Sequence, residues 1–197
     1  MTRKYELILD IAGVLAANFS PFFWRKLSED YDVPYDRLTR FKKEIREELW
    51  TGKLAEAEFW ELLCKHFPAI HREQAKDVLL STITPLPAIQ KVPEWSQYAN
   101  IHLLSNHRIE WIRPIIDPIK KHLSSITLSS QTGYCKPNPQ IYKLVHNKLH
   151  HSNNVWFVDD QNKNFKEASW LGWNTRLADE NGEWIHDITQ LLTTDTN

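Results

Sequence analysis

Short apolar runs and longer amphipathic segments alternate over much of this chain, and several of the runs end in polar residues. The first run, Leu7–Leu9, is followed by Asp10 and, three residues later, by Gly13. A short apolar run of this kind is typical of a buried parallel strand. Similar runs predict further strands at 101–104, 125–128, 155–158 and 174–178. Strands that alternate with helical segments indicate a parallel α/β sheet.

The pattern between the first predicted strand and the others is helical. Apolar residues recur three and four positions apart within 17–84, for example along 38–49, which is the spacing of one buried helix face. Three prolines between 85 and 93 then limit helix formation. We therefore predict an α/β fold: a Rossmann-like, doubly wound parallel sheet made of 1–16 and 85–197, with a helical cap, 17–84, inserted after the first strand.

Composition argues against some classes of partner and indicates the cellular compartment in which the protein is expected. The 197 residues include 24 Lys and Arg against 25 Asp and Glu, and this balance argues against a nucleic-acid partner. No apolar run approaches the roughly 18 residues of a membrane span. Two cysteines are too few for a disulfide framework, and the N-terminus shows no signal-peptide pattern, so we expect a cytoplasmic protein. The sequence does not determine the oligomeric state.

Polar residues stand at or just beyond the ends of the predicted strands, namely Asp10, Ser105–Asn106, Lys136 and Asp159–Asp160. Parallel strands place such residues along one rim of the sheet. Two adjacent acids repel each other without a cation nearby, and Mg²⁺ prefers oxygen ligands. A hydroxyl, an amide and a fixed ammonium can hold a phosphate group. Taken singly, each residue also fits a turn, a helix cap or a solvated charge.

As a set, these residues resemble the motifs of the haloacid dehalogenase (HAD) superfamily of phosphohydrolases. The four segments that carry the resemblance are Leu9–Leu15, Leu103–Asn106, Thr132–Tyr142 and Phe157–Asn164. The helical insertion is similar to the small helical cap of one subgroup. That subgroup includes phosphatases acting on glucose 1-phosphate and the phosphatase domain of soluble epoxide hydrolases.

The resemblance implies Mg²⁺-dependent hydrolysis of a small phosphorylated metabolite, with a sugar phosphate as one candidate, through an aspartyl-phosphate on Asp10. The implied Mg²⁺ ligands are the carboxylates of Asp10 and Asp160 and the backbone carbonyl of Ala12. The implied phosphate-binding residues are Ser105, Asn106 and Lys136. Asp159 is implied to orient Lys136 or a metal-bound water. Four aromatic side chains of the cap either face the leaving group or pack between helices: Trp24, Phe41, Trp50 and Trp60.

One position departs from the family pattern. Most phosphatases of this family carry a second aspartate, the general acid and base, two residues after the nucleophile, where this chain has Ala12. Such groups contribute about 10²–10⁴-fold to the rate. Three interpretations follow from Ala12. The chain is an enzyme for substrates with good leaving groups, a catalytically degenerate phosphate-binding or scaffold protein, or a metal-independent 2-haloacid dehalogenase. Asp159–Asp160 weakens the last alternative. We expect His107 to be solvent-exposed at a helix start, with proton donation as its alternative role.

Overall fold

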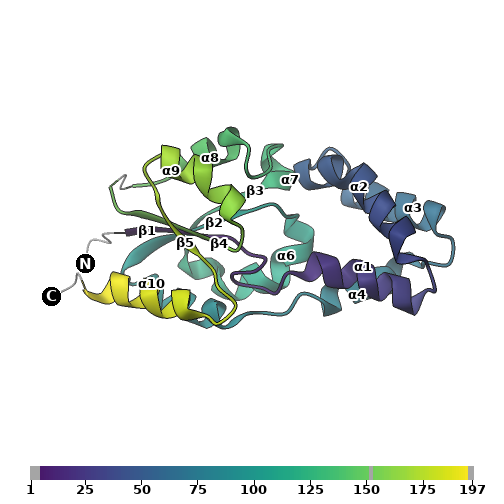
Figure 1. Ribbon diagram of the computed structural model, residues 1–197, viewed down its shortest axis with the longest axis horizontal. Helices are drawn as coiled ribbons and strands as arrows, with labels where there is room; N and C mark the ends of the chain where they lie inside the picture. The colour runs from purple at the N-terminus through teal and green to yellow at the C-terminus, as the bar shows by residue number, and fades with distance from the viewer. Residues whose placement is uncertain (1–4, 151–152, 195–197) are drawn as a thin grey trace.

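A five-stranded sheet in which every pairing is parallel forms the centre of the molecule (Figure 1). The computed structural model describes residues 5–150 and 153–194. The prediction that the N-terminus is not a signal peptide rests partly on residues 1–4, which lie outside this range. The strand order is β3-β2-β1-β4-β5. The strands are β1 (Tyr5–Leu9), β2 (Ala99–Ser105), β3 (Leu123–Leu128), β4 (Val155–Asp159) and β5 (Asn174–Leu177).

Helices connect the strands and fill the region between β1 and β2. The helices before β2 are α1 (Phe19–Asp30), α2 (Tyr35–Thr51), α3 (Glu56–His66), α4 (Arg72–Ser81) and α5 (Val92–Trp95). The later ones are α6 (Ile109–Ile116), α7 (Ser129–Thr132), α8 (Pro139–His146), α9 (Phe165–Trp170) and α10 (Glu183–Thr194). Three 3₁₀ segments are η1 (Pro87–Lys91), η2 (Asp117–His122) and η3 (Asn162–Asn164). Among the described residues, none of these helices has both the length and the apolar character to cross a membrane.

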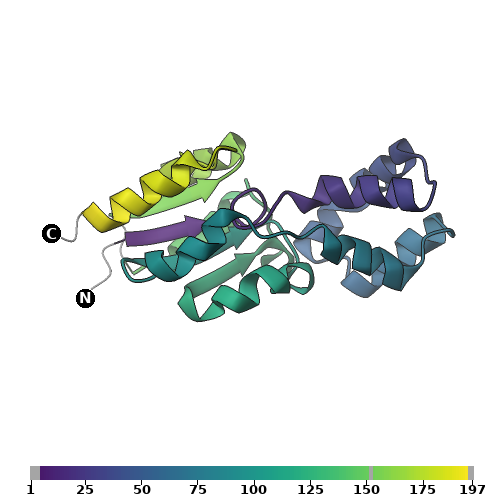
Figure 2. The same ribbon diagram turned by 90° about the horizontal axis from the view of Figure 1, so that it is seen from below.

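The alternation of side chains along β1 builds two separate cores. Leu7 and Leu9 pack in one cluster with residues of α5, α6 and α10, whereas Ile8 packs in the other with residues of α8 and α9. Successive side chains of a strand point to opposite faces, so both faces of the sheet need helices over them. Figure 2 shows α10 and α5 lying along one face. The predicted doubly wound α/β fold is confirmed.

The helices α1 to α4 form a lobe beyond the carboxyl ends of the strands (Figure 2). Helix α2 ends at Gly52, whose φ of 78° is left-handed and therefore suits glycine. Short helices do form at 87–95, because Pro87 and Pro93 occupy first-turn positions that need no amide hydrogen. The division into a core, 1–16 and 85–197, and a cap, 17–84, stays a prediction.

Two side chains of the sheet domain hold this lobe in place. The buried guanidinium of Arg108 donates through Nη1 to the carbonyl oxygens of Leu49, at 3.1 Å, and Leu54, at 2.8 Å. Trp111 Nε1 donates to Glu56 Oε1 at 3.1 Å. Arg108 thus binds one carbonyl in the last turn of α2 and one in the loop that follows it. These bonds fix the face that α2 turns toward the sheet.

A buried polar network crosses the sheet near the amino ends of its strands. The Glu6 carboxylate accepts from Asn100 Nδ2 at 2.9 Å and lies 2.7 Å from His102 Nε2. His102 Nδ1 lies 2.7 Å from Ser125 Oγ. Burial by itself raises the pKa of Glu6, but the hydrogen bonds from His102 and Asn100 outweigh it, and the pKa falls below its ordinary value of 4.5. The folded state therefore favours the Glu6 carboxylate.

We expect Glu6→Ala to lower the free energy of unfolding by about 3–5 kcal/mol, because it leaves buried partners without their acceptor. Part of this stability depends on pH because the pKa of Glu6 is lowered: that part is complete above pH 4.5 and is lost as the pH falls through the lowered pKa. Urea unfolding at pH 7 and at pH 3.5 measures both effects. The matched control is Glu61→Ala, at an exposed position of α3. Equal losses in the two variants would show that the network adds nothing to stability.

Candidate functional site

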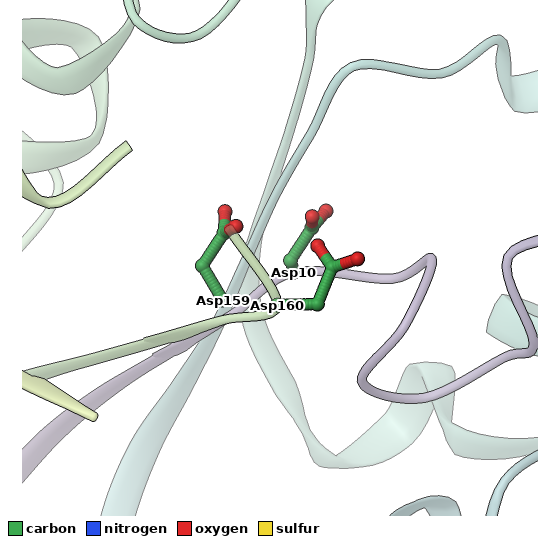
Figure 3. Close-up of side chains that lie close together, drawn as sticks. All are labelled: Asp10, Asp159 and Asp160. Atoms are coloured by element: carbon green, nitrogen blue, oxygen red, sulfur yellow. The ribbon is translucent and has the colours of Figure 1, made fainter. Parts of the chain in front are cut away.

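Three carboxylates meet where the strand order of the sheet reverses. β1 and β4 are neighbours, and their connections run in opposite directions across the sheet, which opens a crevice beyond their carboxyl ends. Asp10 directly follows β1, Asp159 ends β4, and Asp160 comes next. Each of the three offers an oxygen within 4.8 Å of the others. Figure 3 shows their side chains projecting to the same side of the strand ends.

Lys136 lies between two of these carboxylates. Its Nζ is 2.9 Å from Asp10 Oδ2 and 2.5 Å from Asp159 Oδ2, and its side chain is 1% exposed. Burial by itself lowers the pKa of Lys136, but the charges of Asp10 and Asp159 outweigh burial and raise the pKa above its ordinary value. The ammonium therefore stays charged at physiological pH and supplies a fixed cation beside Asp10.

Asp159 is held by donors on both of its oxygens. Asn164 Nδ2 donates to Oδ1 at 2.9 Å and to Oδ2 at 3.0 Å, and the amide nitrogen of Gln161 donates to Oδ1 at 2.8 Å. Burial, followed by the charge of Asp10, raises the pKa of Asp159. This arrangement suits a residue that orients Lys136, which is one of the two roles that the family resemblance implies for Asp159.

Asp160 is half-buried and packs against the turn that follows Asp10. Its Oδ1 accepts from Gln161 Nε2 at 3.1 Å. Burial, and to a lesser extent the charge of Asp159, raises the pKa of Asp160. A Cβ atom built on Gly13, whose φ is +78°, would lie 2.5 Å from Asp160 Cγ. Glycine at 13 thus allows both the backbone turn and the close approach of the Asp160 carboxylate.

The predicted phosphate-binding residues divide into two kinds. Ser105 Oγ is buried and, within 5–150 and 153–194, has no hydrogen-bond partner. In contrast, the Asn106 side chain is already engaged: its Nδ2 donates to the Lys136 carbonyl at 2.9 Å and its Oδ1 accepts from the Lys136 amide at 2.7 Å. Asn106 therefore fixes the loop that carries Lys136, and the free hydroxyl of Ser105 is the clearer candidate ligand.

The expectation that His107 is exposed was wrong. His107 is 7% exposed, because its ring packs against Phe19, at 4.6 Å between centroids, and against Trp50, at 4.9 Å. Burial and the charge of Lys136 lower the pKa of His107 to about 3, so its ring is neutral at physiological pH. Its Nδ1 has no partner among the described residues.

A cavity of about 270 Å³ lies above Asp10 and reaches the cap. Asp10, Ala12, Ser105, Asn106, His107 and Lys136 line its sheet side, together with Gln161, Lys163 and Asn164. Asn18, Ser20, Lys42, Arg46 and Trp50 line its cap side. Of the four cap aromatics, Trp50 faces this cavity, whereas Trp24, Phe41 and Trp60 are buried among other aromatic rings.

Sequence reasoning missed Lys42 and Arg46 on the cap, and Asn164 behind Asp159. The position of Asn164 within the acidic motif, five residues after Asp159, was an available signal. No local signal distinguishes Lys42 or Arg46 from the many exposed charges of α2, because their role depends on how the cap sits over the sheet.

The donors present fit a hard divalent cation. Asp10 and Asp160 bring two carboxylates to one place, and Ala12 lines the same cavity. Oxygen donors of this kind suit Mg²⁺. A bound cation would also offset the repulsion between carboxylates that raises the pKa values of Asp159 and Asp160. These residues are therefore able to hold Mg²⁺ next to Asp10.

Comparisons of sequence and of structure gave different results. The sequence matches no protein-family model and no curated protein. In contrast, the structure superposes on a predicted HAD-like family hydrolase from Porphyromonas gingivalis with a TM-score of 0.77, at 21% identity, covering 98% of this chain and 99% of the other. The chain has the fold of HAD-like hydrolases.

Two further structures share this fold. A HAD family enzyme from Bacteroides thetaiotaomicron, solved with magnesium and inorganic phosphate, matches with a TM-score of 0.73 and 19% identity, covering 92% of this chain and 98% of the other. A structure described as a dehalogenase matches with a TM-score of 0.58 and 20% identity, covering 89% and 85%. At these identities the likeness establishes the HAD-like fold alone.

We expect Gly13→Ala to weaken Mg²⁺ binding about 10-fold or more, because the added Cβ would displace the Asp160 carboxylate. The measurement is the Mg²⁺ concentration that gives half of the maximal increase in melting temperature. Gly172→Ala is the control. Gly172 has the same φ of +78°, but no atom lies within 4 Å of a built Cβ. Both variants carry the backbone strain, so equal Mg²⁺ affinities would contradict a metal site at Asp160.

Proposed function

We propose that this protein is a Mg²⁺-dependent phosphohydrolase that cleaves a small phosphate monoester through an aspartyl-phosphate on Asp10. The observation that carries the proposal is the buried Lys136, paired with Asp10 and Asp159 at the floor of a cavity that also contains the unpartnered Ser105 hydroxyl. A fixed cation, a free hydroxyl and a carboxylate together suit a phosphoryl group. The volume of about 270 Å³ favours a small substrate.

In the first step, an Asp10 oxygen bonds to phosphorus while the bond from phosphorus to the leaving oxygen breaks. Lys136 and Ser105 offset the charge on the phosphoryl oxygens during this transfer. In the second step, water attacks the phosphorus of the aspartyl-phosphate, which releases inorganic phosphate and restores the Asp10 carboxylate. The leaving alkoxide gains one proton and the attacking water loses one, so the net reaction consumes one water per ester.

The Mg²⁺ ion, when bound, supplies charge neutralisation between the Asp10 carboxylate and the phosphate dianion. Asp10, Asp160 and the carbonyl of Ala12 are its proposed ligands, and Asp159 holds Lys136. The Bacteroides thetaiotaomicron enzyme of the same fold is described as a complex with magnesium and inorganic phosphate, which supports this choice of cation and ligand. We also propose that the chain is related to glucose 1-phosphate phosphatases and that its substrate is a sugar phosphate.

Ala12 restricts which leaving groups the site can release, because position 12 lacks an acid that could protonate them. Its methyl side chain lines the cavity but cannot give a proton to a departing alkoxide. The neutral ring of His107 lines the same cavity, and its pKa of about 3 makes it a weak base. Substrates whose leaving group departs with little proton transfer, such as a sugar anomeric phosphate, therefore suit this site best.

Ala12 also favours a second candidate, a phosphate-binding protein without turnover. This alternative keeps Lys136 and Ser105 as ligands and predicts saturable phosphate binding with no hydrolysis of any monoester. A 2-haloacid dehalogenase is disfavoured because the Asp160 carboxylate beside Asp10 has no use in a metal-free site. Chloride release from a 2-chloro acid, unaffected by a chelator, would be the signature of that chemistry.

We expect the wild-type protein to hydrolyse nitrophenyl phosphate in the presence of Mg²⁺ and to lose this activity with a chelator. Asp10→Asn should lower kcat by more than about 10³-fold, because an amide is a poor nucleophile at phosphorus. Phosphate release is the measurement, and a single cooperative thermal unfolding transition in Mg²⁺-free buffer shows that the variant folds. Equal activity of the two proteins would exclude Asp10 as the nucleophile.

We expect Ala12→Asp to raise the hydrolysis rate of an alkyl phosphate by about 10²-fold, because a positioned acid can protonate a poor leaving group. Nitrophenyl phosphate, whose leaving group departs readily, should gain much less. Ala17→Asp, in the same segment but outside this cavity, is the control. If Ala12→Asp brings no gain with the alkyl ester, the missing acid is not what limits the reaction.

A further inference from the structure

Helix α2 turns a row of two cations and one aromatic ring toward the cavity. Lys42, Arg46 and Trp50 are spaced four residues apart, which places them on one helix face, and all three line the cavity that contains Asp10. The same three also border a small, mostly apolar void inside the cap. Arg108 fixes this orientation through its bond to the carbonyl of Leu49. The row therefore belongs to the cavity wall.

Among the described residues, no carboxylate pairs with the two cations of this row. Across 5–150 and 153–194, neither Lys42 nor Arg46 forms an ion pair. Like charges four residues apart on a helix repel each other. Lys42 is half-buried, and burial followed by the charge of Arg46 lowers its pKa. The nearby acids of α2, Glu44 and Glu47, are exposed and do not line the cavity.

The phosphoryl end of a substrate does not account for these two cations. Among the cavity-lining residues described, Asp10 is the acidic one, and it is already paired with Lys136. Phosphate held at Asp10 has Lys136 and Ser105 as its own partners, all from the sheet domain. Lys42 and Arg46 come from the cap and thus face whatever the phosphoryl group is attached to.

We propose that the substrate carries a second anionic group, a carboxylate or a second phosphate, on its leaving group, and that Lys42 and Arg46 bind it. The substrate class is then a phosphorylated carboxylic acid or a bisphosphorylated compound. This inference rests on the proposed phosphate site at Asp10 but does not depend on turnover. The half-buried ammonium of Lys42 and the guanidinium of Arg46 have no ion-pair partner in the described part of the chain, so they gain most from such an anion, because hydrogen bonds between charged groups are the strong ones.

Binding of phosphonates, which no phosphatase cleaves, separates this proposal from catalysis. The probes are phosphonoacetate, phosphonopropionate and phosphonobutyrate, which place a carboxylate at increasing distance from the phosphonate. The corresponding alkylphosphonates, which keep the phosphonate but lack the carboxylate, are the matched partners. Propane bisphosphonate tests a second phosphate-like group. In the presence of Mg²⁺, calorimetry should show at least one probe with a second anionic group binding about 10-fold or more tightly than its alkylphosphonate partner. Whether carboxylate or bisphosphonate binds tighter identifies the second group.

Lys42→Gln and Arg46→Gln should each remove most of this preference while leaving alkylphosphonate affinity within about twofold. Lys43→Gln, at an exposed position of the same helix, should keep it. Arg46 is exposed, so its variant tests the proposal even where Lys42→Gln fails to fold. Equal affinity for every probe and its alkylphosphonate partner, or a preference that survives both substitutions, overturns the second-anion site. Absence of binding by all phosphonates removes the phosphate site and this proposal together.

Discussion

The buried ammonium of Lys136, held between Asp10 and Asp159, is the interaction on which this structure most depends. A charge that is 1% exposed is costly unless it is paired. The two carboxylates come from neighbouring strands and the ammonium from a distant loop, so their pairing joins three segments of the chain. Asn106 supports it by holding the backbone of Lys136, and Asn164 supports it by holding Asp159. Loss of Lys136 would leave two buried carboxylates without their cation.

The fold divides the tasks of the site between its two parts. The sheet places carboxylates, an ammonium and a hydroxyl at the point where the strand order reverses, which is where open parallel sheets bind ligands. The lobe of α1 to α4 supplies Lys42, Arg46 and Trp50 from above. Arg108 and Trp111 fasten the lobe to the sheet domain through Leu49 and Glu56. In our proposals, the phosphate-binding groups and the groups that select the substrate therefore come from different segments of the chain.

Local sequence predicted the sheet and much of the site because the relevant signals are short. Runs such as Leu7–Leu9 and Val155–Val158 form strands, and the acids that end them meet because parallel strands share an edge. Reasoning of the same kind failed for His107. Its exposure depends on Phe19 and Trp50, which lie far away in the chain and close over its ring only in the folded molecule.

The sequence by itself determined the fold class, the helical insertion and the polar residues at the strand ends, because the periodicity of side chains and the composition of motifs are properties of neighbouring residues. The tertiary structure alone decided that Lys136 is buried between two carboxylates and that the Asn106 side chain binds the backbone of Lys136. It also decided that Lys42 and Arg46 line the cavity that contains Asp10. The position of Lys42 and Arg46 depends on the angle at which the cap meets the sheet. That angle is set by contacts between residues more than fifty positions apart, such as Arg108 with Leu49 and Leu54, which no local pattern encodes.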